Sequence, residues 1–267
     1  SMAILFNRKE SQEQCESIAR IEQGLAPDSD DYIFRGLILN QNSVTQLLPC
    51  CYRDAVGFYY NALVSYAQGL YSVSKKNYSW ASVQLYYSVY YACRATLGFD
   101  KYIIIRKGDL FKLKIADAEQ TQKLNNRNDH KMTIDCYKKT YGQTDYLLSN
   151  NIDNIDFYTW IAELREITHY KQKHFKEPDY LNPFNVIASE LKLGKMICNL
   201  LEHYSTNWNL YCFQEEYAAI VGPYRLIIDA HQKYIQQTER ISTLQRKYID
   251  KIFKDIKWSN IVPSILQ

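Results

Sequence analysis

The spacing of apolar residues predicts a chain that is mainly helical. Between residues 53 and 74, apolar positions recur every three or four residues, at Val56, Tyr60, Leu63, Ala67 and Leu70. This spacing is typical of one face of an amphipathic helix. Over residues 78–98 the apolar positions step by four, at Ala81, Leu85, Val89, Cys93 and Leu97. These two segments are the first two helices of the predicted bundle, and Gly98 is the expected C-cap of the second.

A short β-hairpin is expected to interrupt the helices. Two apolar stretches, over residues 102–105 and 110–115, flank Lys107-Gly108-Asp109, which is typical of a hairpin turn. The polar residues 116–129 are expected to form an exposed loop. A third helix is expected from residue 130 to about residue 141.

Two further helices complete the predicted bundle. Asp153 or Asn154 is the expected N-cap of the fourth helix, whose apolar positions are Phe157, Trp160, Ile161, Leu164, Ile167 and Thr168. Residues 184–204 are expected to form the fifth helix, and the bundle is expected to close there.

The chain therefore divides into three predicted parts. Residues 1–45 are an N-terminal arm with a helix over residues 8–25 and a turn over residues 26–31. Residues 46–205 are the helical bundle. Residues 206–267 are a C-terminal helical extension, with a break at Gly222-Pro223 and an apolar stripe at Ile241, Leu244, Tyr248, Ile252 and Ile256.

The composition narrows the class of protein. The net charge of +3 is too small to indicate nucleic-acid binding by bulk electrostatics. No segment approaches the ~20 apolar residues that cross a bilayer, so no membrane association is expected. Seven cysteines without a C-x-x-C pair favour free thiols in a reducing cytoplasm. The motifs of phosphate-binding loops and zinc proteases are missing, so neither a cofactor nor a metal is predicted.

Two stretches of the chain resemble the HEPN superfamily of prokaryotic helical bundles. The first is Ser82-Val-Gln-Leu-Tyr-Tyr-Ser-Val-Tyr-Tyr-Ala-Cys-Arg-Ala95, and the second is Glu163-Leu-Arg-Glu-Ile-Thr-His-Tyr170. They resemble the second and last core helices of that family, and His130-Lys131 is similar to the start of the helix between them. The resemblance covers residues 50–205. It implies an all-α, HEPN-like helical bundle, here with a small β-hairpin insertion and a C-terminal helical extension.

The resemblance implies a protein of a defence or toxin–antitoxin system that engages RNA. In ribonucleases of this family, an Arg and a His lie on one helix with four to six residues between them, and a homodimer joins two such helices. The His acts as general acid or base at the ribose 2′-hydroxyl, and the Arg stabilises charge on the phosphate without a metal. Here the resemblance assigns these roles to Arg165 and His169, with Tyr170 and Glu166 in support. It places the homodimer on the helices that carry Arg94 and Arg165.

The spacing of this pair departs from the family pattern. Three residues separate Arg165 from His169, and Tyr170 occupies the position with four residues between. On an ideal helix Arg165 and His169 still share a face, whereas Tyr170 is a poor base because its phenol titrates near ~10. Two functions follow. One is a metal-independent endoribonuclease, and the other is a non-catalytic HEPN-like subunit that binds a partner protein or a nucleotide-handling enzyme.

The candidate site residues, the tyrosines and the basic C-terminal residues can each also be explained by a purely structural role. Arg165 can form surface ion pairs with Glu163 or Glu166, and His169 can lie in a helix-packing seam. Ten tyrosines fall between residues 52 and 91. Their rings can stack on unpaired bases, and they also suit packing within a bundle or dimer. The basic residues near the C-terminus fit either a phosphate-binding or a solvated helix face.

Overall fold

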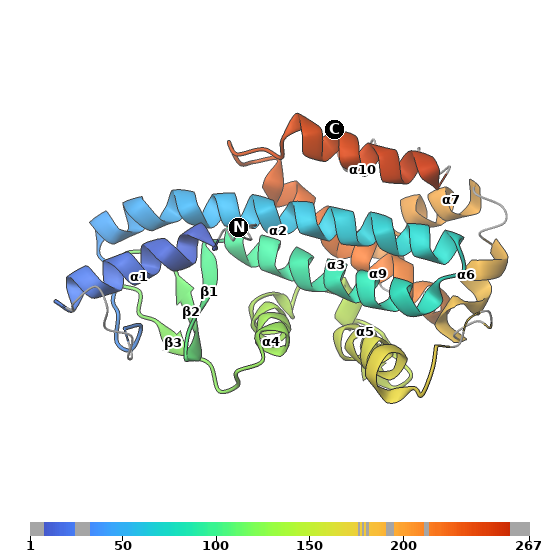
Figure 1. The fold of residues 1–267 in the computed structure, drawn as a ribbon, viewed down its shortest axis with the longest axis horizontal. Coiled ribbons are helices and arrows are strands. Elements are labelled where there is room, and N and C mark those ends of the chain that lie inside the picture. Colours follow the sequence, from blue (N-terminus) through green and yellow to red (C-terminus); the bar gives the residue numbers. More distant parts are fainter. Residues whose placement is uncertain are drawn as a thin grey trace, which may run out of the picture.

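Two long helices form the centre of the molecule (Figure 1). The computed structural model describes residues 8–24, 33–175, 177, 179, 182–190, 195–210 and 214–256. Helices α2 (Gln41–Ser74) and α3 (Tyr78–Phe99) lie side by side, and α9 (Ala218–Tyr234) packs along α3. The fold is mainly helical with small antiparallel sheets. This confirms the mainly helical chain that the apolar spacing predicts.

Small residues allow α2 and α3 to approach closely. A Cβ atom on Gly98 would lie 2.8 Å from the Cβ atom of Ala55, and one on Gly69 would lie 2.8 Å from the Leu85 side chain. The prediction that Gly98 is the C-cap of α3 is wrong, because the C-cap is Asp100. Gly98 instead leaves room for the neighbouring helix.

Helix α2 begins earlier than the predicted start at residue 53. The side chain of Asn40 caps it by accepting a hydrogen bond of 2.9 Å from the backbone N–H of Ser43. Pro49 lies inside the helix, although proline lacks a backbone donor and usually interrupts helices. The apolar spacing does not indicate the first turns of α2, because residues 41–43 are polar and Pro49 normally interrupts a helix.

The predicted hairpin is confirmed as part of a three-stranded antiparallel sheet. Strand β1 (Tyr102–Lys107) pairs with β2 (Asp109–Lys114), and Gly108 between them has φ of 66°. Strand β3 (Gln122–Lys123) pairs with β2, so the predicted loop over residues 116–129 contains a short strand. Two residues are too few to show an alternating pattern.

The hairpin separates two hydrophobic clusters. Ile103 and Ile105 on one face of β1 belong to a smaller cluster beneath α1, whereas Ile104 on the other face belongs to the larger cluster around α2, α3 and α9. Alternation along the strand explains this division, because successive side chains point to opposite faces. The smaller cluster also contains Cys15, Ile18, Phe34, Leu47, Cys51, Phe111 and Leu113.

Helix α1 (Glu10–Glu22) confirms the helix predicted over residues 8–25. A side chain from α2, rather than one of its own, caps its N-terminus. Its own N-cap residue, Lys9, makes no side-chain cap. The carboxylate of Asp54, on α2, accepts hydrogen bonds from the backbone N–H groups of Glu10 at 3.0 Å and Ser11 at 2.9 Å. The turn predicted over residues 26–31 lies outside the described residues.

Helix α4 (Asp129–Tyr141) confirms the third predicted helix, but the start of the next one differs from its prediction. Asp153 and Asn154 have φ of 50° and 67° and form the turn of a second hairpin rather than a helix cap. Asp156 is the actual cap, and it accepts hydrogen bonds from two backbone N–H groups. The elements of this region are η1 (Tyr146–Leu148), β4 (Asn151–Ile152), β5 (Ile155–Asp156), α5 (Phe157–Glu166) and the π-helical turn η2 (Ile167–Lys171).

The C-terminal region contributes to the core of the bundle. The elements after η2 are η3 (Asn182–Phe184), α6 (Asn185–Glu190), α7 (Lys195–His203), α8 (Asn207–Leu210), η5 (Glu215–Tyr217), α9 and α10 (Thr243–Asp255). The helix predicted over residues 184–204 corresponds to α6 and α7, and residues 191–194 lie outside the described residues. Because α9 is buried against α3, the segment expected to extend from the bundle supplies part of its centre.

The predicted break at Gly222-Pro223 is wrong, since α9 runs through both residues. A Cβ atom on Gly222 would lie 2.1 Å from the Phe157 ring, so this glycine allows α5 to approach α9. In α10 the predicted stripe is partly wrong. Ile252 is buried, whereas Leu244 is 79% exposed.

Candidate functional site

The four residues predicted from the HEPN resemblance lie at the end of α5 and in the π-helical turn that follows it. At this end the backbone N–H of Gln172 donates to the carbonyl of Ile167 at 3.1 Å, five residues back. Bonds of this kind widen the helix, and such turns are frequent at functional sites. The widened turn carries His169 and Tyr170, so their angular positions differ from those of an ideal α-helix.

Arg165 lies against two tyrosine rings. Its guanidinium carbon is 4.6 Å from the ring centroid of Tyr86 and 5.5 Å from that of Tyr170. The side chain is 17% exposed, and its Nε has no hydrogen-bond partner among the described residues. A guanidinium is attracted to the face of an aromatic ring. The rings therefore hold Arg165 in place and leave part of its donor capacity unused.

His169 lies among exposed aromatic side chains. Its ring centroid is 5.2 Å from that of Trp80, 5.0 Å from that of Tyr170 and 6.3 Å from that of Phe175. These three aromatic residues are 43%, 68% and 46% exposed, respectively. The Nδ1 atom of His169 is buried without a hydrogen-bond partner in the part of the chain that the structure describes. Ring packing, rather than a hydrogen bond, positions this imidazole.

Tyr170 joins the two residues of the predicted pair. Its ring contacts both Arg165 and His169, whereas Arg165 and His169 show no direct hydrogen bond within the described ranges. Glu166 lies to one side, with its carboxylate oxygens 3.9 Å from Arg165 Nη2 and 3.6 Å from Lys171 Nζ. These are the surface ion pairs expected as the structural alternative, and exposed pairs of this kind stabilise little.

Three residues that the prediction did not include complete this surface: Trp80, Tyr86 and Phe175. The carboxylate of Glu177 accepts hydrogen bonds from the backbone N–H of Ser79 at 2.6 Å and from its hydroxyl at 2.7 Å. This contact holds the chain after η2 against the start of α3, where the rings of Trp80 and Phe175 lie 6.2 Å apart. Trp80 could have been suspected, because it lies off the apolar stripe of its helix. We define the aromatic–arginine surface as Trp80, Arg165, His169, Tyr170 and Phe175 together with Tyr86, whose buried ring supports Arg165 from beneath.

His130 extends the aromatic packing along α3. Its ring stacks on Tyr90 with centroids 4.1 Å apart, and its Nδ1 is 3.2 Å from the Tyr86 hydroxyl oxygen. Burial lowers the pKa of His130, and Arg165 adds to this effect while Asp129 opposes it. Burial also raises the pKa of Tyr86 to about 12, although Arg165 lowers it. At neutral pH a protonated phenol and a neutral imidazole can therefore share one hydrogen bond.

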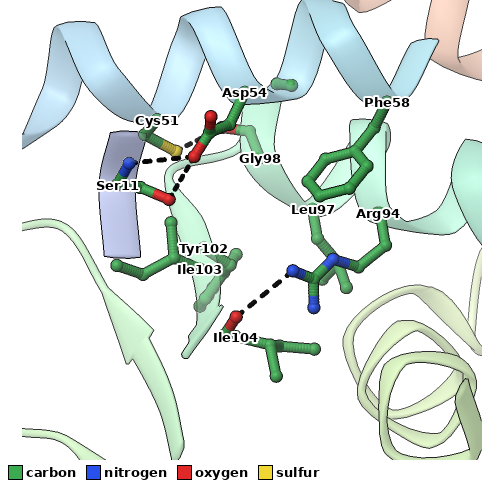
Figure 2. A pocket seen from close by; sticks show the side chains of 11 residues that line it. Ser11, Cys51, Asp54, Phe58, Arg94, Leu97, Gly98, Tyr102, Ile103 and Ile104 are labelled. Atoms are coloured by element: carbon green, nitrogen blue, oxygen red, sulfur yellow. Dashed lines mark hydrogen bonds between the residues drawn. The ribbon is translucent and has the colours of Figure 1, made fainter. Parts of the chain in front are cut away.

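A small cavity beside Arg94 is part of the scaffold (Figure 2). Its volume is about 10 Å³, close to the space needed by one water molecule. Figure 2 shows Asp54 turned toward Ser11 and Arg94 turned toward the carbonyl of Ile104, which it contacts at 3.2 Å. Arg94 is 5% exposed and also donates to Asp129 at 3.2 Å. The polar groups here join α1, β1 and α4 to the central helices.

Known proteins give no independent assignment. No protein-family model, curated protein or solved structure matches this chain. Within the described residues, no group of three or more His, Cys, Asp or Glu side chains is placed to hold a metal ion. No helix of that part is long and apolar enough to cross a membrane. The assignment of function therefore rests on the geometry of the chain itself.

Proposed function

We propose that this chain is a HEPN-like protein that binds single-stranded RNA on the aromatic–arginine surface. The observation that carries the proposal is the exposure of Trp80, Tyr170 and Phe175 around His169, beside the guanidinium of Arg165. Exposed aromatic rings stack on unpaired bases, and guanidinium groups bind phosphate in a fork. Both kinds of contact are available at one place on the surface.

The expected ligand is unpaired RNA with little sequence preference. Stacking uses the face of any base, and it requires bases that are free of a duplex. Lys171 adds a cation at the edge of the surface, with 61% of its side chain exposed. Because few cations take part and the net charge is only +3, we expect moderate affinity that falls as salt is added.

In this proposal a homodimer cuts the bound RNA without a metal. His169 accepts the proton of the ribose 2′-hydroxyl as that oxygen bonds to phosphorus, and the 5′-oxygen leaves with a proton from His169 of the partner subunit. Arg165 stabilises the charge on the phosphate. Tyr170 positions both side chains, and Glu166 orients Arg165 through their ion pair. The family resemblance supports a prokaryotic defence or toxin–antitoxin system as the setting.

A non-catalytic role is the second candidate, and the packing of His169 favours it. Catalytic histidines are normally oriented by a hydrogen bond through the second ring nitrogen, and Nδ1 of His169 has no such partner among the described residues. Ile167 is 43% exposed and lies in the same turn as Tyr170. In this role the surface docks a partner protein or a nucleotide-handling enzyme.

Fluorescence anisotropy with a short labelled oligouridine tests RNA binding. We expect Trp80→Ala to weaken binding by about fivefold or more, because stacking contributes ~1–3 kcal/mol per base. Trp208→Ala is the matched control, since Trp208 is 87% exposed on α8 and lies outside the surface. Equal affinities for the wild type and Trp80→Ala contradict the proposed binding surface.

Cleavage of a mixed RNA pool in EDTA tests the catalytic step. We expect His169→Ala and Arg165→Ala to abolish cutting, and His174→Ala, a change at an exposed histidine outside the surface, to retain it. RNA that is bound but left intact by the wild type would establish binding without catalysis. RNA that is neither bound nor cut would favour the partner-docking role.

A further inference from the structure

A polar cleft of about 350 Å³ lies beside α9 and shares no lining residue with the aromatic–arginine surface. Its volume is within the range of small-molecule sites, roughly 300–1,000 Å³. Thr96 of α3 lines it together with Tyr141 and Asp145, which lie at and just after the end of α4. Arg225 and Asp229 line it from α9. Because α8 also contributes a lining residue, four separate segments of the fold build this cleft.

The cations of the cleft are already bound to protein acceptors. Arg225 donates to the side chain of Asn207, and its Nη2 lies 2.7 Å from Oδ1 of Asp229. Only 9% of the Arg225 side chain is exposed. Lys233 donates to both carboxylate oxygens of Asp100 at 2.9 Å. Because these cations are already paired, the cleft is poorly suited to an anionic ligand.

One carboxylate of the cleft has no cation paired with it. Asp145 and Asp229 line the cleft together with Arg225 and Lys233, but Lys233 is neutralised by Asp100, which lies outside the lining, and Arg225 pairs with Asp229, so Asp145 forms no ion pair among the described residues. Burial raises the pKa of Asp145, and the charge of Asp229 raises it further, although the Tyr158 hydroxyl donates to Asp145 and lowers it. Burial likewise raises the pKa of Asp229. A bound cation would reduce the repulsion between the two carboxylates.

Thr96 supplies an independent sign of a ligand. It is 2% exposed and lines the cleft, yet its hydroxyl has no hydrogen-bond partner among the residues that the structure describes. A buried hydroxyl without a partner costs ~1–3 kcal/mol. A ligand that brings a hydrogen-bonding group to Thr96 would remove this cost.

Tyrosine rings make the cleft suitable for an ammonium group. Tyr137, Tyr141 and Tyr146 line it, and aromatic faces attract organic cations. The cleft already contains one such contact, because the Lys233 ammonium lies 5.7 Å from the Tyr141 ring centroid. Carboxylates, tyrosine rings and an unpartnered hydroxyl are the combination that a small hydrogen-bonding amine requires.

We propose that this cleft binds a small aliphatic amine. One ammonium group of the ligand is held by Asp145, Asp229 and the tyrosine rings, and a second polar group reaches the hydroxyl of Thr96. The proposal does not depend on RNA binding, since it uses other residues and a different ligand.

Calorimetric titration of the full chain, without RNA, tests the proposal with putrescine as the probe and butanediol as its neutral match. We expect putrescine to bind and butanediol not to bind. Thr96→Val should weaken putrescine binding by about fivefold to tenfold, because it removes a hydrogen bond to the ligand. The same variant should raise the melting temperature of the ligand-free protein, because it removes the buried hydroxyl. A substitution that merely damaged the fold would lower that temperature.

Two aspartate variants complete the test. Asp229→Asn should weaken putrescine binding, whereas Asp135→Asn, at an exposed carboxylate of α4 outside the cleft, should leave it unchanged. The proposal is overturned if putrescine does not bind at millimolar concentration. It is also overturned if butanediol binds equally well, or if Thr96→Val binds putrescine as tightly as the wild type.

Discussion

The guanidinium carbon of Arg165 lies 4.6 Å from the centroid of the Tyr86 ring, which links the end of α5 to the middle of α3. These two residues come from the two stretches that carry the family resemblance. Tyr86 in turn contacts His130 through its hydroxyl, so α3, α4 and α5 meet in one continuous set of contacts. A change at any of these residues is expected to affect both the surface and the packing beneath it.

Arg165→Lys and Tyr86→Phe should separate these two effects. Lysine keeps the charge but lacks the planar group that stacks on a ring and binds phosphate in a fork, so we expect oligouridine binding to fall severalfold. Tyr86→Phe keeps the ring and loses the contact with His130, so binding should persist while the free energy of unfolding falls by about 1 kcal/mol. Anisotropy and urea denaturation measure the two quantities. Unchanged binding by Arg165→Lys would show that charge alone suffices.

Gly222→Ala should destabilise the protein, whereas Gly57→Ala should stabilise it. Both glycines lie within helices, where alanine is normally favoured by ~1 kcal/mol. The new Cβ atom at residue 222 would lie 2.1 Å from the Phe157 ring, whereas nothing lies within 4 Å of the position at residue 57. We expect a loss of ~1–3 kcal/mol for Gly222→Ala from overpacking. Urea denaturation that gave the two variants equal stability would contradict the close packing of α5 on α9.

His130→Gln should make the stability less sensitive to acid. Burial lowers the pKa of His130 in the folded protein below its ordinary value, so the unfolded chain takes up this proton first as the pH falls. The part of the free energy of unfolding that depends on neutral His130 is fully present above about pH 6.5. It is lost as the pH falls below that value toward the pKa of His130 in the folded protein. Denaturation at about pH 7 and about pH 5 should therefore show a smaller loss for His130→Gln than for the wild type. An equal loss in both proteins would show that His130 contributes none of it.

Asp54→Ala should weaken the attachment of α1. It removes the acceptor of two backbone N–H groups at the start of that helix, and the loss of a helix cap costs ~0.5–2 kcal/mol. Limited proteolysis should cut within residues 10–22 sooner than in the wild type. Asp135→Ala is the control, because the carboxylate of Asp135 is exposed on α4 and pairs only with Lys131 in the described structure. Equal cleavage of the two variants would contradict a capping role for Asp54.

The sequence predicted the elements whose signal is local and regular. The step of four in α3 and the turn chemistry at Gly108 identified that helix and the hairpin. The predictions at Gly98 and Gly222 are wrong because each glycine allows a neighbouring helix to approach, which is a tertiary contact that local sequence does not reveal. The start of α2 was predicted too late because Pro49, a residue that normally ends a helix, lies inside this one.

Only part of the candidate site could be predicted from the sequence. Arg165 and His169 stood out through their residue types and the family resemblance, and Tyr170 lies beside them in the chain. Phe175 could not be associated with Trp80 without the contact between Glu177 and Ser79. The cleft that contains Thr96 and Asp229 draws on four segments that lie far apart in the chain, and none of its residues belongs to a recognisable motif.

Because β1 divides the core into two clusters, we expect the two clusters to open at different free energies. The cluster that contains Cys15 and Ile103 is small and lies outside the larger one, so it can open while the central helices stay folded. Regions with fewer buried apolar contacts exchange their amide hydrogens through such partial openings, at a lower free energy than global unfolding. Hydrogen exchange should therefore be faster in α1 and the hairpin than in α3, and the thiol of Cys15 should react with a labelling reagent before that of Cys93.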